Sequence, residues 1–126
     1  METTMKVSLF EQVPYRYIPE GFEKQYSSVV TAPYQVVEPG RMQESLFSAY
    51  AELLHGARAG FDGICVTEHS QSSYDISPNP TLLASAVACA AQAAGLDVAI
   101  TILGRSLGKT REPLKIAGRA AFRFAS

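Results

Sequence analysis

The sequence predicts an α/β fold built on a parallel sheet. Three short apolar stretches each run into polar residues, and two segments of helical length separate them. Strands that alternate with helices pair in parallel through right-handed crossovers. Two architectures fit this order, an open doubly wound sheet and part of a (β/α)8 barrel. In both, functional groups gather at the carboxyl ends of the strands.

The three strands are expected at 6–10, 61–67 and 96–103. The first alternates apolar and polar side chains, as a half-buried strand does. The second is continuously apolar over 64–66, which is typical of a strand covered on both faces, and the third is nearly all apolar.

Two long helices are expected between these strands. Residues 42–59 carry an apolar stripe at helical spacing, and residues 80–94 are rich in alanine and follow Asn79 as a candidate N-cap. Gly60 and Gly95 supply the left-handed residue that commonly ends a helix. A third helix is expected to open at Glu112-Pro113 and to cover 114–117.

The loop at 13–41 is rich in proline and tyrosine, and two interpretations of it stay open. It is long for a small domain, and long loops are often functional, so Tyr15, Tyr17 or Tyr34 are candidates for the mouth of a substrate site. Packing of these aromatic rings against one another is the equally weighted alternative.

Composition indicates a single small globular domain. The chain has 126 residues, of which 47% are hydrophobic and 18% charged, and its net charge of −1 gives no field that would attract nucleic acid or an anionic membrane. No window reaches the length of a membrane span, and no signal peptide is apparent. Cys65 and Cys89 are expected to be buried free thiols, which favours the cytoplasm. No Cys or His spacing predicts a metal site.

The stretch GRSLGKT at 104–110 looks like a nucleotide phosphate loop, but its spacing is wrong. Such a loop needs four residues between its glycines, and only three lie between Gly104 and Gly108. Pro113 also places the next helix start too late. A solvated basic loop and a loop that holds some other ligand phosphate are the two interpretations left.

The second strand runs directly into Thr67-Glu68-His69. An imidazole at a strand end can give or take a proton near neutral pH, although a lone histidine is more often a loop or packing residue. His55 lies on the first long helix and is expected to be solvated or interfacial.

Three segments in order resemble the bacterial luciferase-like, flavin-dependent monooxygenase family. They are MKVSLFEQ, YAELLHGARAGFDGICVTEHS, and YDISPNPTLLASAVACAAQAAGLDVAITILGRSLGKTREPLKIA, which together cover about residues 5–117. The resemblance implies a partial (β/α)8 TIM barrel made of the first three βα units. It also implies reduced FMN as cosubstrate, and oxygenation of a small organic substrate such as an aldehyde.

The resemblance also implies roles for single residues. His69, with Glu68 beside it, matches the catalytic segment near the flavin. Phe10 and Glu11 at the first strand end, and Gly104, Arg105 and Ser106 at the third, are expected to contact the cofactor, and several family members have a cis peptide at the position of Gly104-Arg105.

The sequence departs from the family after Ala117. We expect residues 1–126 to form one incomplete luciferase-like domain, with 1–117 family-like and GRAAFRFAS at 118–126 an aberrant tail. A frameshift is our hypothesis for the origin of this tail. Three strands cannot close a barrel, so we expect a truncated chain that binds flavin poorly and is inactive. The alternatives are a non-catalytic α/β interaction module, which pairs with itself or with another subunit through its open sheet edge, and a small phosphate-binding protein that uses 104–110.

Overall fold

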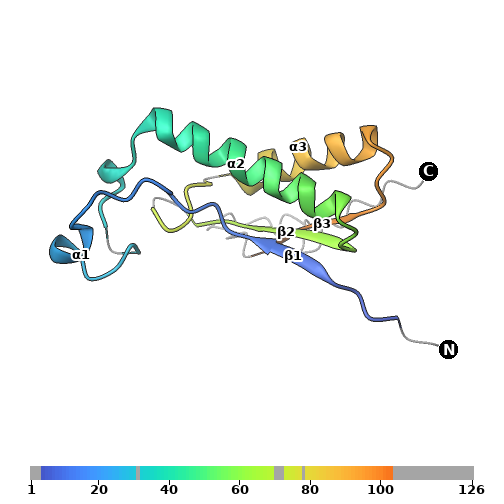
Figure 1. The fold of residues 1–126 in the computed structure, drawn as a ribbon, viewed down its shortest axis with the longest axis horizontal. Helices are drawn as coiled ribbons and strands as arrows, with labels where there is room; N and C mark the ends of the chain where they lie inside the picture. The colour runs from blue at the N-terminus through green and yellow to red at the C-terminus, as the bar shows by residue number, and fades with distance from the viewer. Residues whose placement is uncertain (1–3, 31, 70–72, 78, 104–126) are drawn as a thin grey trace, which may run out of the picture.

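The computed structural model describes residues 4–30, 32–69, 73–77 and 79–103, and within them the predicted parallel sheet is confirmed. Its strands are β1 (Ser8–Glu11), β2 (Gly63–Thr67) and β3 (Ala99–Leu103), in the order β1-β2-β3 (Figure 1). In register, Phe10 lies opposite Cys65, which lies opposite Thr101 on its other side.

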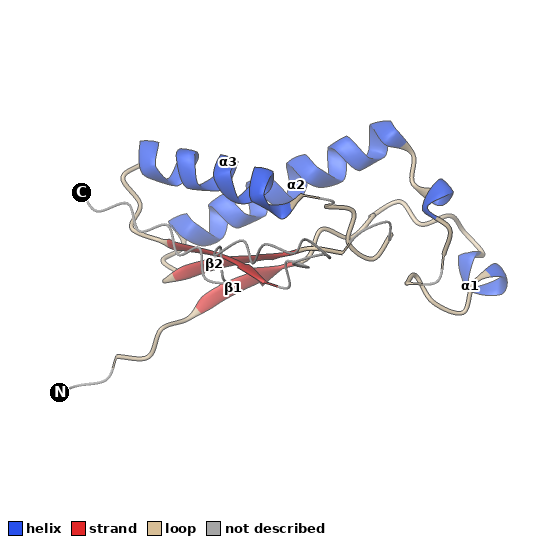
Figure 2. Ribbon diagram, turned by 180° about the vertical axis from the view of Figure 1, so that it is seen from behind, coloured by secondary structure: helices blue, strands red, loops and turns tan. Residues whose placement is uncertain are grey.

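Two long helices cover one face of this sheet. Helix α2 (Pro39–Arg58) packs on β1 and β2, whereas α3 (Pro80–Ala93) packs on β2 and β3 and against α2. Both helices lie on the same side of the strands (Figures 1 and 2). The loop between β1 and α2 contains a short helix, α1 (Phe22–Gln25), and a 3-10 turn, η1 (Tyr34–Val36).

The core lies between the sheet and the helices. Ile64 and Val66 of β2 and Ile100 of β3 point toward it, and each is about 1% exposed. The helices contribute Leu53 and Val87, which are fully buried. Because side chains alternate along a strand, Phe10, Cys65 and Thr101 point to the face that the helices do not cover.

The predicted helix boundaries are confirmed at three of four ends. Gly60 and Gly95 have positive φ values of 93° and 67° after the helix ends, and Asn79 accepts a hydrogen bond from the Thr81 amide at 3.2 Å, as an N-cap does. Helix α2 begins at Pro39, three residues earlier than predicted, because proline is well tolerated in a first helical turn.

The strands β2 and β3 begin later than the apolar pattern predicts. The residues before them instead make hydrogen bonds at the amino end of the sheet. The Asp62 carboxylate accepts hydrogen bonds from the Lys6 ammonium at 2.8 Å and the Val7 amide at 2.9 Å. These two bonds hold the pKa of Asp62 below its ordinary value. The Asp62 carbonyl accepts from the Ala99 amide.

The two cysteines differ in their surroundings. Both are free thiols, and Cys65 is buried as predicted. The prediction was wrong for Cys89, which is exposed on α3 because it lies on the side of that helix away from the core residues Val87 and Ala91. His55 is exposed on α2, as expected, and the predicted helix at 114–117 lies outside the described residues.

Candidate functional site

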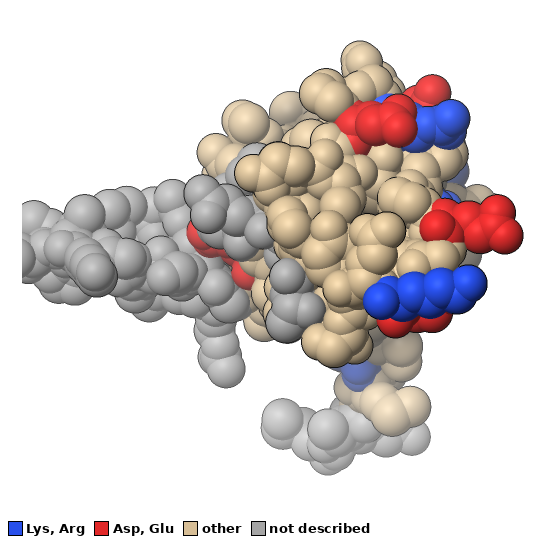
Figure 3. All heavy atoms as spheres, turned by 90° about the vertical axis from the view of Figure 1, so that its left-hand side faces the viewer, with Lys and Arg blue, Asp and Glu red and all other residues tan. Residues whose placement is uncertain are grey.

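Two loops meet over the carboxyl ends of β1 and β2. The Tyr15 amide donates to the Ser73 carbonyl at 2.9 Å, and the Ile76 amide donates to the Val13 carbonyl at 2.8 Å. These bonds fix residues 73–77 against the start of the loop after β1. Figure 3 faces this side of the molecule, and the charged side chains there are of both signs and lie mainly toward one edge.

The fixed segment places a carboxylate against the end of β2. Oδ2 of Asp75 accepts a hydrogen bond from the Thr67 hydroxyl at 2.7 Å, and the same oxygen lies 3.2 Å from Nδ1 of His69. Oδ1 accepts from the Ser77 amide at 3.1 Å. The three residues Thr67, His69 and Asp75 therefore form one hydrogen-bonded cluster at a strand end.

Burial divides this cluster into an inner and an outer part. Asp75 is 0% exposed, whereas the side chain of His69 is 43% exposed. A buried carboxylate is costly unless hydrogen bonds satisfy it, and here donors meet both of its oxygens. The ring of Tyr74 meets the imidazole edge to face at 5.3 Å between centroids. The imidazole is thus held from inside and reaches solvent outside.

Asp75 was missed in the sequence, where Glu68 stood out as the carboxylate beside His69. Within the described residues, Glu68 makes no hydrogen bond or ion pair, and it lies one residue past the end of β2. The available signal was a single acidic residue beside Ile76 in a polar loop. Its pairing with His69 depends on the loop path, which the sequence pattern does not fix.

Phe10 and Glu11, both predicted to contact a cofactor, point to opposite faces of the sheet. Phe10 is on the face away from the helices and is 49% exposed. Glu11 points toward α2, where burial and then the charge of Glu52 raise its pKa, and Arg16 opposes them. Arg16 also pairs with Glu52 at 2.6 Å. Of these two residues, only Phe10 offers its side chain to a ligand on the open face.

The third predicted strand end cannot be placed in the same way. β3 ends at Leu103, which is exposed. Gly104, Arg105 and Ser106, the expected cis peptide, and the phosphate-loop-like stretch 104–110 lie outside the described residues.

Some tyrosines of the loop at 13–41 pack against the rest of the loop, whereas others are exposed enough to line a substrate mouth. Tyr15 is buried, and its hydroxyl accepts a hydrogen bond from the Glu38 amide at 3.2 Å, so it packs the loop. Tyr17 lies edge-on to Tyr15, with the Arg41 guanidinium 4.5 Å from its ring centroid. Tyr17 and Tyr34 are partly exposed, so these two rings are the ones that could line a substrate mouth.

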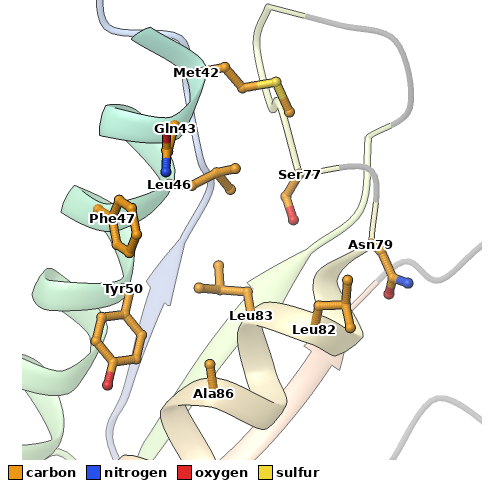
Figure 4. A pocket seen from close by; sticks show the side chains of 10 residues that line it. All are labelled: Met42, Gln43, Leu46, Phe47, Tyr50, Ser77, Asn79, Leu82, Leu83 and Ala86. Carbon is orange, nitrogen blue, oxygen red and sulfur yellow. The ribbon is translucent and has the colours of Figure 1, made fainter. Parts of the chain in front are cut away.

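A hollow with a volume of about 620 Å³ opens between the amino-terminal halves of α2 and α3 (Figure 4). Its lining has no charged residue and consists of Met42, Gln43, Leu46, Phe47, Tyr50, Ser77, Asn79, Leu82, Leu83 and Ala86. Phe47 on α2 and Leu82 on α3 are 65% and 70% exposed. An apolar surface of this kind is unusual on a protein without a partner.

Other kinds of site find little support in the part of the chain described. No group of three His, Cys, Asp or Glu side chains there is placed to hold a metal ion. None of its helices combines the length and apolar character that a membrane span requires.

Comparisons with protein-family models, with curated protein sequences and with solved structures found no match.

Proposed function

We propose that this chain carries the strand-end site of an FMN-dependent oxidoreductase, a monooxygenase that uses reduced flavin and O2 on a small organic substrate. The observation that supports the proposal most is the imidazole of His69, held at the carboxyl end of β2 by the buried carboxylate of Asp75. α/β enzymes place their catalytic groups at this end of a parallel sheet, and His69 is a half-exposed base there.

The arrangement of layers supports a partial (β/α)8 barrel over a doubly wound sheet. The strands follow one another across the sheet in sequence order, and α2 and α3 cover the same face (Figures 1 and 2). Right-handed crossovers that continue in one direction keep their helices on one face, as in a barrel, whereas a doubly wound sheet has helices on both faces. The face without helices then corresponds to the barrel interior.

The residues on that face suit a flat, largely apolar ring. Phe10 and Leu103 are exposed apolar side chains there, and the Thr67 side chain points to the same face by alternation along β2. FMN would supply the redox chemistry when bound. His69 would exchange a proton with the ligand, and Arg105 and Ser106 carry donors that a phosphate accepts.

We also propose a cellular compartment for the protein and an affinity of this chain for FMN. Two free thiols fit a reducing compartment such as the cytoplasm. Because the described sheet is open at β1 and β3, we expect weak FMN binding by the 126-residue chain, with Kd roughly between 10 µM and 1 mM. We expect turnover of reduced FMN to be below detection.

The test is a titration of FMN fluorescence with the purified chain. We expect quenching that Phe10→Ala and His69→Ala each weaken at least about threefold, a loss typical of one buried contact. Phe47→Ala, an exposed aromatic on α2 on the helix-covered side of the sheet, is the matched control and should leave Kd unchanged. ATP in place of FMN should not bind, and ATP binding would instead favour the phosphate-binding alternative at 104–110.

A second candidate function, a non-catalytic interaction module, is favoured by the hollow between α2 and α3. The same surface carries an apolar hollow and two protruding apolar side chains, Phe47 and Leu82. A surface with both a knob and a hole can pair with its own copy around a two-fold axis. We therefore propose a second copy of this chain as its partner.

Sedimentation velocity tests this module. A dimer that Phe47→Glu dissociates, while Val30→Glu at another exposed apolar position has no effect, would support it. A chain that stays monomeric at about 100 µM, a concentration at which weak interfaces assemble, would exclude it.

A further inference from the structure

We propose that Asp75 is a positioning residue that keeps the neutral imidazole of His69 protonated on Nδ1. The other ring nitrogen, Nε2, is then presented as an acceptor toward whatever ligand occupies the strand ends. The role of this nitrogen in catalysis rests on the proposed flavin function. The tautomer itself rests only on the contacts of the described residues.

The hydrogen-bond inventory around Asp75 fixes the direction of the His69 contact. An ionised carboxylate accepts hydrogen bonds and donates none. Oδ1 takes the Ser77 amide, and Oδ2 takes the Thr67 hydroxyl together with the His69 ring at 3.2 Å. If Asp75 is ionised, Nδ1 is therefore the donor to Oδ2. A neutral imidazole carries one N–H, so Nε2 has a free lone pair.

The acceptor side of this pair is rigid. Asp75 is 0% exposed and lies between two backbone hydrogen bonds that join residues 73–77 to the loop after β1, one through Ser73 and one through Ile76. Thr67, its other partner, is the last residue of the central strand. The carboxylate cannot rotate without breaking bonds to both sides.

Two contacts orient the imidazole of His69, the donor of this pair, and the rest of the ring is partly exposed. The Tyr74 ring stands at 90° to the imidazole, and Asp75 occupies Nδ1. The imidazole side chain is nevertheless 43% exposed, and among the described residues only Nδ1 has a hydrogen-bond partner. A base of fixed tautomer needs no reorganisation before it accepts a proton, and the imidazolium that forms would stay paired with the carboxylate.

This role differs from the one expected for Glu68. The sequence places Glu68 next to His69, but within the described residues it makes no hydrogen bond to the ring. Removing its charge should therefore leave the tautomer alone, which makes Glu68→Gln a matched control for Asp75→Asn.

The ring nitrogens of both histidines can be read directly by 15N NMR of the chain labelled with 15N-histidine, at a pH where the rings are neutral. His55, the only other histidine in the sequence, is exposed on α2 and serves as the internal reference. We expect His69 to show the Nδ1–H form in about tenfold excess or more, whereas His55 should show the Nε2–H form that water favours. His69 in the Nε2–H form would overturn the proposal, whatever the variants do.

The variant Asp75→Asn then tests whether Asp75 sets the tautomer of His69. The amide oxygen can keep the Ser77 bond, which places the NH2 group where Oδ2 was, and this group donates to Nδ1. We expect the proton to move to Nε2 in this variant and to stay on Nδ1 in Glu68→Gln and Thr67→Val. An unchanged tautomer in Asp75→Asn would overturn the role of Asp75. If Asp75→Asn does not fold, the Thr67→Val and wild-type spectra decide. No flavin is present, so this outcome is separate from that of the FMN titration.

Discussion

The imidazole of His69 and the carboxylate of Asp75 are six residues apart in the sequence and 3.2 Å apart in space. Asp75 also accepts a hydrogen bond from the hydroxyl of Thr67, the last residue of β2. A buried acid and a half-exposed base are thereby joined at the sheet edge where α/β proteins carry out their chemistry.

Removing the buried carboxylate should destabilise the fold. Asp75→Ala leaves the Thr67 hydroxyl and the Ser77 amide without their acceptor in a buried site, which should cost about 2–4 kcal/mol of unfolding free energy. Asp97→Ala, at an exposed position, should change it by less than about 0.5 kcal/mol. Urea unfolding of both variants measures this, and equal effects would show that the cluster is not a buried network.

Burial, rather than apolar character, determines how much each leucine contributes to the free energy of unfolding. Leu53 is fully buried between α2 and the sheet, so Leu53→Ala should lose about 2–5 kcal/mol. Leu82→Ala, at the rim of the hollow, should lose less than about 1 kcal/mol in the monomer. A large loss for Leu82→Ala that depends on protein concentration would instead indicate that the hollow is covered by a second copy.

Glu11 should make stability fall as pH rises. Burial and the charge of Glu52 raise its pKa above the ordinary value of 4.5. Its contribution is therefore fully present below about pH 4.5 and is lost as pH rises through the folded-state pKa. Glu11→Gln removes this loss. We expect the variant to be more stable at pH 7 by a few tenths of a kcal/mol after solvent screening, and to gain nothing at pH 4.

The matched control for Glu11→Gln is Glu23→Gln on α1, which is exposed. Thermal unfolding at the two pH values compares them. A destabilised Glu11→Gln at pH 7 would mean that attraction to Arg16 outweighs burial and Glu52, contrary to what we expect.

The two thiols should react at very different rates. Cys65 is only 7% exposed on β2, and burial raises its pKa, so little thiolate is formed. Cys89 is exposed on α3. Ellman's reagent should modify one thiol of the native chain quickly and the second about 100-fold more slowly, and two at once in denaturant. Rapid labelling of both in the native chain would place Cys65 at the surface.

Local signals predicted much of the fold. Asn79, Gly60 and Gly95 fix helix ends through short-range geometry, and continuous apolar runs identified β2 as a fully buried strand. The exposed Cys89 was missed because nearly every position of α3 is alanine or another apolar residue, so the pattern does not show which side faces the core.

The site was less predictable than the fold. His69 stands out because it follows a strand, and its location at a strand end was predicted. Asp75 does not stand out, because its burial depends on two backbone hydrogen bonds, from Tyr15 to Ser73 and from Ile76 to Val13, that join its segment to the distant loop after β1. Phe10 and Glu11 are adjacent in the sequence, yet the alternation of side chains along β1 leaves only Phe10 on the open face.

The most direct measurement of the proposed function is the response of the two histidines to FMN in 15N and 1H NMR spectra of the chain. If FMN binds at the strand ends, His69 should shift progressively with FMN concentration, His55 should not, and ATP should move neither. A His69 signal that stays in place at FMN concentrations well above the fitted Kd, or that moves only with ATP, would contradict a flavin site at this edge of the sheet.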